Sequence, residues 1–118
     1  MAHILLVDDD QSMLGFLDGA LSKAGHLVTT AENGTDALSL IQENDHYDLL
    51  LTDIVMPGID GIELSRKATH CRPKLKVMFI TGFSAVALND GVHKKAPLMA
   101  KPFHLNDLVH KVDEVLKA

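Results

Sequence analysis

The chain has 118 residues, 47% hydrophobic and 23% charged, which predicts one globular domain over residues 1–118 and excludes a disordered chain. Its net charge is −5, and the lysines and arginines are dispersed along the second half, so we expect no nucleic-acid partner. A single cysteine excludes an internal disulfide framework, and the short apolar run at residues 4–7 excludes a signal peptide and a membrane span, which predicts a cytoplasmic protein.

The first half of the chain alternates short apolar runs with amphipathic segments. Residues 2–7 are too few for a buried helix and predict a strand. Residues 11–24 have helical spacing, with one stripe expected to face the core: Met13, Phe16, Leu17, Ala20, Leu21 and Ala24. The same alternation predicts a strand, a helix and a strand at residues 27–31, 35–43 and 49–52.

The second half repeats the alternation. It predicts helices at residues 61–70, 85–88 and 105–116 and strands at residues 77–80 and 98–100. Five strands that alternate with five helices imply parallel crossover units, and continuous apolar strands imply a sheet covered on both faces. We therefore predict an α/β fold with a doubly wound, five-stranded parallel sheet in the flavodoxin-like order 2-1-3-4-5.

Polar residues follow four of the predicted strands and would meet at one edge of the sheet, where ligands bind in such folds. They are Asp8–Asp10 after the first strand, Asp53 after the third, Thr81 after the fourth and Lys101 after the fifth. Carboxylates this close repel one another unless a cation lies between them, and oxygen ligands suit Mg²⁺ better than zinc. The alternative is that the three adjacent aspartates are only turn and cap residues, which is what we expect for Asp10.

Four motifs at these strand ends resemble the receiver domain of response regulators over essentially the whole chain. They are VDDD at 7–10, LLLTDIVMPGIDG at 49–61, FITGF at 79–83 and KPF at 101–103. The resemblance implies that Asp53 accepts a phosphoryl group from a phosphohistidine on a histidine kinase or histidine phosphotransfer protein.

The same resemblance assigns the remaining site residues. Asp8 and Asp9 would be the acidic pair that binds Mg²⁺, with Asp9 the more direct ligand, and Val55 would offer its backbone carbonyl to the ion. Thr81 and Lys101 would hold phosphoryl oxygens. The protein would then catalyse only its own phosphorylation and dephosphorylation, and it would have no effector domain.

Three longer stretches, at residues 49–68, 75–89 and 101–109, resemble the CpdR group of single-domain alphaproteobacterial receivers. This resemblance implies that the protein is an adaptor for the ClpXP protease in cell-cycle control and that its unphosphorylated form promotes proteolysis. We expect the protein to be a monomer or a weak dimer. A phosphate shuttle between histidine phosphotransfer proteins stays open as an alternative. Two further alternatives are disfavoured by the sequence. An aspartyl phosphatase requires a carboxylate at the position of Val55, and a flavin-binding domain requires a glycine-rich loop at the position of the three aspartates.

Further expectations concern the details of the site. Leu98 occupies the position of the usual switch aromatic of receivers, which would alter the coupling of the switch. The Lys101–Pro102 bond is expected to be cis, as it usually is in the domains that this chain resembles. In the receivers that this chain resembles, the side chains at the positions of Val55 and Phe83 border the path of an attacking water. Valine and phenylalanine cannot orient that water, which predicts slow self-dephosphorylation.

Overall fold

The computed structural model describes residues 2–81, 97–101 and 103–118. Its elements are, in order, β1 (His3–Val7), α1 (Gln11–Lys23), β2 (Leu27–Ala31), α2 (Gly34–Glu43), β3 (Leu49–Asp53), α3 (Gly61–Cys71), β4 (Lys76–Thr81), β5 (Leu98–Ala100) and α5 (Leu105–Lys117). The helix expected at 85–88 and the expected cis bond before Pro102 lie outside the described residues. None of the described helices is both long and apolar enough to cross a membrane.

All five strands form one parallel sheet in the order β2-β1-β3-β4-β5, which confirms the predicted topology. The register aligns the strand ends, because Val7 pairs with Thr52 and Asp53 pairs with Ile80. Thr81 in turn pairs with Ala100. The carboxyl ends of β1, β3, β4 and β5 therefore meet at one edge of the sheet.

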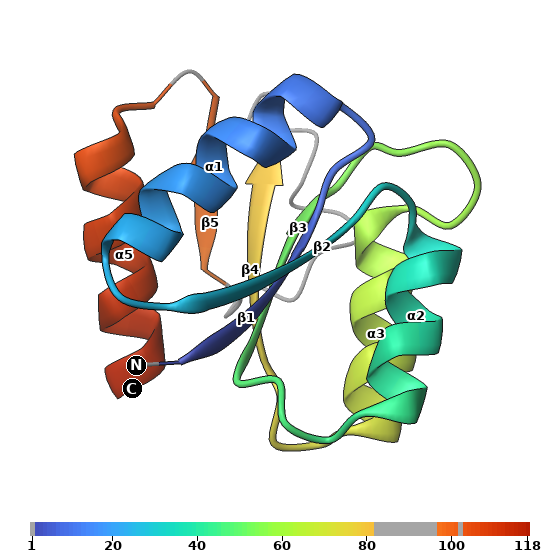
Figure 1. The fold of residues 1–118 in the computed structure, drawn as a ribbon. Helices are drawn as coiled ribbons and strands as arrows, with labels where there is room; N and C mark the ends of the chain where they lie inside the picture. Colours follow the sequence, from blue (N-terminus) through green and yellow to red (C-terminus); the bar gives the residue numbers. More distant parts are fainter. Residues whose placement is uncertain (1, 82–96, 102) are drawn as a thin grey trace.

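The sheet is covered on both faces, with α1 and α5 on one side and α2 and α3 on the other (Figure 1). Alternate residues of β1 supply the two cores, since Ile4 and Leu6 pack toward α1 and α5 whereas Leu5 and Val7 pack toward α2 and α3. These strand side chains are fully buried, as expected for a parallel sheet between two helical layers.

Helix α1 begins where the sequence predicts, but its buried face differs from the expected one. Asp10 caps the helix by accepting hydrogen bonds from the N–H groups of Ser12 and Met13 at 2.9 and 3.3 Å, which confirms its role as a cap residue. The buried residues are Leu14, Leu17 and Leu21.

The expected core stripe of α1 is therefore wrong in part. Phe16 is 58% exposed and Ala24 is also exposed. The apolar side chains of the helix cover an arc of almost half its circumference, wider than a single ridge, so spacing alone fits two neighbouring ridges. The sheet selects the ridge that contains Leu14, and Met13 and Ala20 lie half-buried at its border.

Candidate functional site

Four polar side chains converge at the carboxyl edge of the sheet, as the sequence predicts. The ammonium nitrogen of Lys101 lies 3.2 Å from Asp53 Oδ2 and 3.4 Å from Asp8 Oδ2. Asp8, Asp9 and Asp53 each offer a carboxylate oxygen, and these three oxygens lie within 4.8 Å of one another. The structure thus brings three acids and one cation into a single cluster.

The backbone fixes the position of each group. Asp53 ends β3 and its Oδ1 accepts a hydrogen bond from the N–H of Val55 at 3.3 Å. Thr81 ends β4 as a fully buried residue, and its carbonyl oxygen accepts the N–H of Lys101 at 2.7 Å. This bond holds Lys101 beside β4, so that its side chain reaches toward the two aspartates.

The orientation of Asp8 depends on a contact that the sequence analysis missed. Its Oδ1 accepts the N–H of Asp10 at 2.9 Å, which leaves Oδ2 for Lys101. The signal was present in the sequence, because an aspartate side chain commonly binds the N–H two residues later. Asp10 therefore contributes to the cluster through its backbone, while its side chain caps α1.

The charges in the cluster are not balanced within the protein. Burial raises the pKa of Asp8, the negative charge of Asp53 raises it further, and the hydrogen bond from Asp10 and the charge of Lys101 only partly oppose this. Burial lowers the pKa of Lys101, but the hydrogen bond to Asp53 and the charges of both aspartates outweigh it, so this pKa is raised overall. Lys101 is therefore a persistent cation that contacts two of the three carboxylates.

This donor set fits Mg²⁺. The side chains supply only oxygen atoms, the three carboxylates are within reach of one ion, and one of them carries a charge that burial disfavours. Val55 lies at the mouth of the cluster with 49% of its surface exposed. The role of its carbonyl oxygen stays a prediction, and Phe83, which was expected to border the same site, lies outside the described residues.

The raised pKa of Asp8 predicts a pH dependence of stability in ion-free solution. The folded protein binds a proton at Asp8 more readily than the unfolded chain does, so this group lowers stability as pH rises from about 3.8, its ordinary value, through its raised folded pKa. Asp8→Asn should therefore be more stable than the native protein at pH 7, and the difference should shrink toward pH 4.

Urea unfolding in the presence of EDTA at several pH values would measure this difference. Asp45→Asn, which changes an exposed acid at the opposite edge of the sheet, should show no such trend. A constant difference between native protein and Asp8→Asn across this pH range would contradict the assignment.

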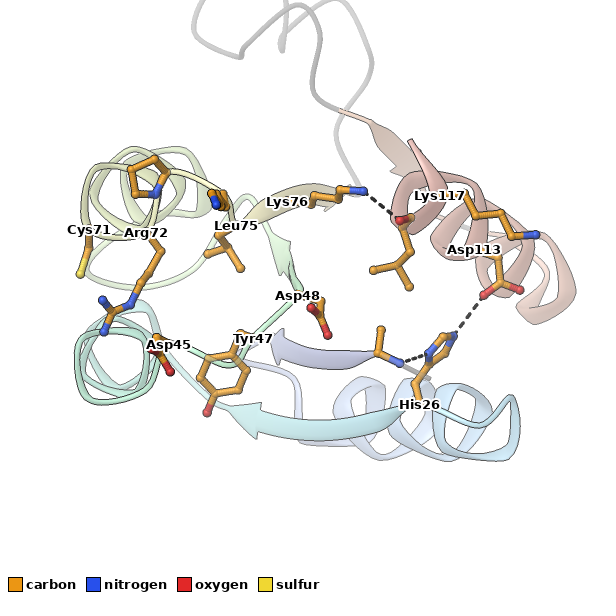
Figure 2. A pocket seen from close by; sticks show the side chains of 14 residues that line it. His26, Asp45, Tyr47, Asp48, Cys71, Arg72, Leu75, Lys76, Asp113 and Lys117 are labelled. Atoms are coloured by element: carbon orange, nitrogen blue, oxygen red, sulfur yellow. Dashed lines mark hydrogen bonds and ion pairs between the residues drawn. The ribbon is translucent and has the colours of Figure 1, made fainter.

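A hollow of about 840 Å³ lies at the opposite, amino edge of the sheet (Figure 2). Three of the residues that line it join elements of the fold to one another. Arg72 donates to carbonyl oxygens at the end of α2, and Lys76 donates to those of Leu116 and Ala118 at the end of α5. His26 joins Ala2 to Asp113. These contacts indicate a structural role, so the acidic cluster is the stronger candidate site.

The chain is similar to known proteins over essentially its whole length. The family model of the response regulator receiver domain matches residues 4–113. The chain is 52% identical over 120 residues to the response regulator receiver protein CpdR of Brucella abortus, and the match covers 100% of this chain and 99% of that protein.

Two further similarities extend the comparison. The chain is 33% identical over 119 residues to the sensor kinase CckA of Brucella abortus, and this match covers 98% of the chain but 13% of the kinase. The crystal structure of a response regulator receiver protein from Sinorhizobium medicae has a TM-score of 0.92 at 28% identity and covers 99% of this chain and 95% of that one.

Proposed function

Because the chain belongs to the response regulator receiver domain family, we propose that it is a cytoplasmic signalling protein that accepts a phosphoryl group on Asp53 from a phosphohistidine partner. The observation that carries this proposal is the cluster itself: Asp53 lies 3.2 Å from Lys101 and within 4.8 Å of the oxygens of Asp8 and Asp9. The similarity to a segment of a sensor kinase supports a histidine kinase or histidine phosphotransfer protein as the donor.

The chemistry follows from the positions of the side chains. A carboxylate oxygen of Asp53 attacks phosphorus, a new P–O bond forms, and the P–N bond to the donor imidazole breaks with its electron pair returning to nitrogen. Bound Mg²⁺ would neutralise charge on the transferred oxygens. Lys101 exchanges its contact with Asp53 for a phosphoryl oxygen, and the Thr81 hydroxyl takes another.

The proposed output is contact with another protein, in which the unphosphorylated form acts as an adaptor for ClpXP proteolysis in cell-cycle control. Identity of 52% over essentially the full length of a CpdR protein supports this proposal, since the resemblance to that group extends well beyond the phosphorylation motifs. Phosphorylation of Asp53 would end the interaction.

A pull-down tests the adaptor proposal. Native protein, native protein phosphorylated in Mg²⁺, and Asp53→Ala are each immobilised and exposed to purified ClpX. We expect native protein and Asp53→Ala to retain ClpX and the phosphorylated protein to release it. Equal retention by all three forms, or by none, would reject the proposal, and retention of a histidine phosphotransfer protein alone would favour the phosphate shuttle.

The lifetime of the phosphorylated state depends on how water reaches phosphorus. The Val55 side chain is half exposed at the mouth of the site and has no group that accepts a hydrogen bond from an attacking water. We therefore expect slow self-dephosphorylation, and we expect Val55→Asn to accelerate it several-fold because an amide oxygen can orient the water.

Phosphate loss after removal of the donor, followed in Mg²⁺, would test this expectation. Leu27→Asn is the matched control, since Leu27 is 53% exposed and lies at the amino edge of the sheet. The proposed effect of Val55 on water is contradicted if native protein loses its phosphate within seconds, or if Val55→Asn and native protein lose it at the same rate.

A further inference from the structure

The segment between β3 and α3, residues 54–60, lies against two glycines that begin neighbouring helices. Gly34 is the first residue of α2, and a β-carbon built on it would lie 2.8 Å from the carbonyl oxygen and 3.0 Å from the β-carbon of Ile59. Gly61 is the first residue of α3, and a β-carbon there would overlap the carbonyl oxygen of Asp53. Both contacts involve backbone atoms, so neither position accommodates a side chain without movement of the segment.

Hydrogen bonds and burial fix the beginning of this segment. The N–H of Ile54 donates to Ile80 on β4 at 3.1 Å, and the N–H of Gly61 donates to the carbonyl oxygen of Ile54 at 2.7 Å. Ile54 and Met56 are 5% and 6% exposed. Farther along the segment, Ile59 is half-buried against the core on this side of the sheet and lies close to Gly34 on α2.

The segment matters for the acidic cluster because it carries Val55. The N–H of Val55 donates to Asp53 Oδ1, and Val55 is only half buried, so its own side chain does little to hold it in place. Ile59 packs against the buried cluster that contains Met56 and the core residues of α2, so a shift of Ile59 away from α2 would also displace Met56, which adjoins Val55. The hydrogen bond at 3.3 Å is already at the long end of the usual range and would be readily lost.

We propose that Gly34 is a positioning residue for the metal site, although it belongs to a different helix and lies outside the acidic cluster. Its missing side chain lets the start of α2 support Ile59, and this support holds the backbone of Val55 beside Asp53. The inference rests on the proposed function, because it concerns the Mg²⁺ that this function requires. The two glycines differ in their contacts, since a β-carbon at Gly61 would meet Asp53 itself, whereas a β-carbon at Gly34 would meet Ile59.

Gly34→Ala is the direct test. Alanine is a better helix former than glycine, which favours a folded variant, while its methyl group must displace Ile59. We expect the concentration of Mg²⁺ at half-saturation, measured by titration calorimetry without a phosphodonor, to rise about three- to tenfold. Phosphorylation of Asp53 at saturating Mg²⁺ should stay within about twofold of native, since Asp53 and Lys101 are unmoved.

The control is Gly19→Ala on α1, where a β-carbon would meet no atom within 4 Å, and it should leave both quantities unchanged. A second variant, Ile59→Ala, removes the side chain that contacts Gly34 and should raise the half-saturation concentration in the same direction without any clash. It keeps the proposal testable if Gly34→Ala does not fold.

The outcomes distinguish failure of the positioning role of Gly34 from failure of the proposed function. If the native protein binds Mg²⁺ and is phosphorylated while Gly34→Ala and Ile59→Ala bind the ion as tightly as native, the positioning role is overturned and the proposed function stands. If the native protein itself neither binds Mg²⁺ nor accepts phosphate, the proposed function fails, and the positioning role fails with it. A loss of stability in Gly34→Ala with unchanged Mg²⁺ binding would also overturn the positioning role.

Discussion

Asp53→Ala is expected to reduce phosphate uptake from acetyl phosphate in Mg²⁺ to background, a loss of roughly a hundredfold or more. The reason is geometric, because the Asp53 carboxylate is both in contact with Lys101 and central to the three-acid cluster. Alanine removes the carboxylate and with it the nucleophilic oxygen. The measurement is the stoichiometry of base-labile phosphate on the protein.

Asp45→Ala is the matched control, since it removes an exposed acid near the opposite edge of the sheet and should leave uptake unchanged. Labelling of Asp53→Ala at the stoichiometry of native protein would reject Asp53 as the acceptor. Labelling reduced in both variants to the same extent would point to a general effect of charge.

Asp9→Ala is expected to weaken Mg²⁺ binding at least tenfold, which corresponds to about 1.4 kcal/mol. Asp9 is the exposed member of the cluster, so its carboxylate can bind an ion without first breaking a contact inside the protein. Without the ion the same change removes one of three neighbouring negative charges, and ion-free Asp9→Ala should be at least as stable as native protein.

Calorimetric titration with Mg²⁺ and urea unfolding in EDTA measure the two effects on the same samples. Loss of a metal ligand should lower the Mg²⁺ affinity without lowering the stability of the ion-free protein. A general disruption of the site would lower both the affinity and the stability. An unchanged Mg²⁺ titration for Asp9→Ala would count against a metal site at this cluster.

The sequence predicted the parallel sheet well because each strand is a short apolar run that ends at a polar residue. The five predicted strands, including the three-residue β5, are all present, and the rule that ligands bind at carboxyl ends placed Asp8, Asp53 and Lys101 together. The predicted cap role of Asp10 is also confirmed, since its side chain accepts the N–H groups of Ser12 and Met13 within a local motif.

What the sequence could not supply was any contact set by packing between distant segments. Phe16 was expected in the core because it shares the helical spacing of α1, and only the position of the sheet shows that Leu14 is buried in its place. The contact between Gly34 and Ile59 joins residues on different elements, and no local pattern encodes how closely they approach. The chemistry of the site could thus be read locally, whereas its support could not.

The most direct test of the account is to map the phosphorylated residue. Native protein is treated with acetyl phosphate in Mg²⁺, the acyl phosphate is reduced with borohydride, which converts a phosphorylated aspartate to homoserine, and the peptides are sequenced by mass spectrometry. The account predicts homoserine at position 53 alone, and only in samples that contained Mg²⁺. Homoserine at position 8 or 9, stable phosphate on a histidine, or equal modification without Mg²⁺ would contradict it.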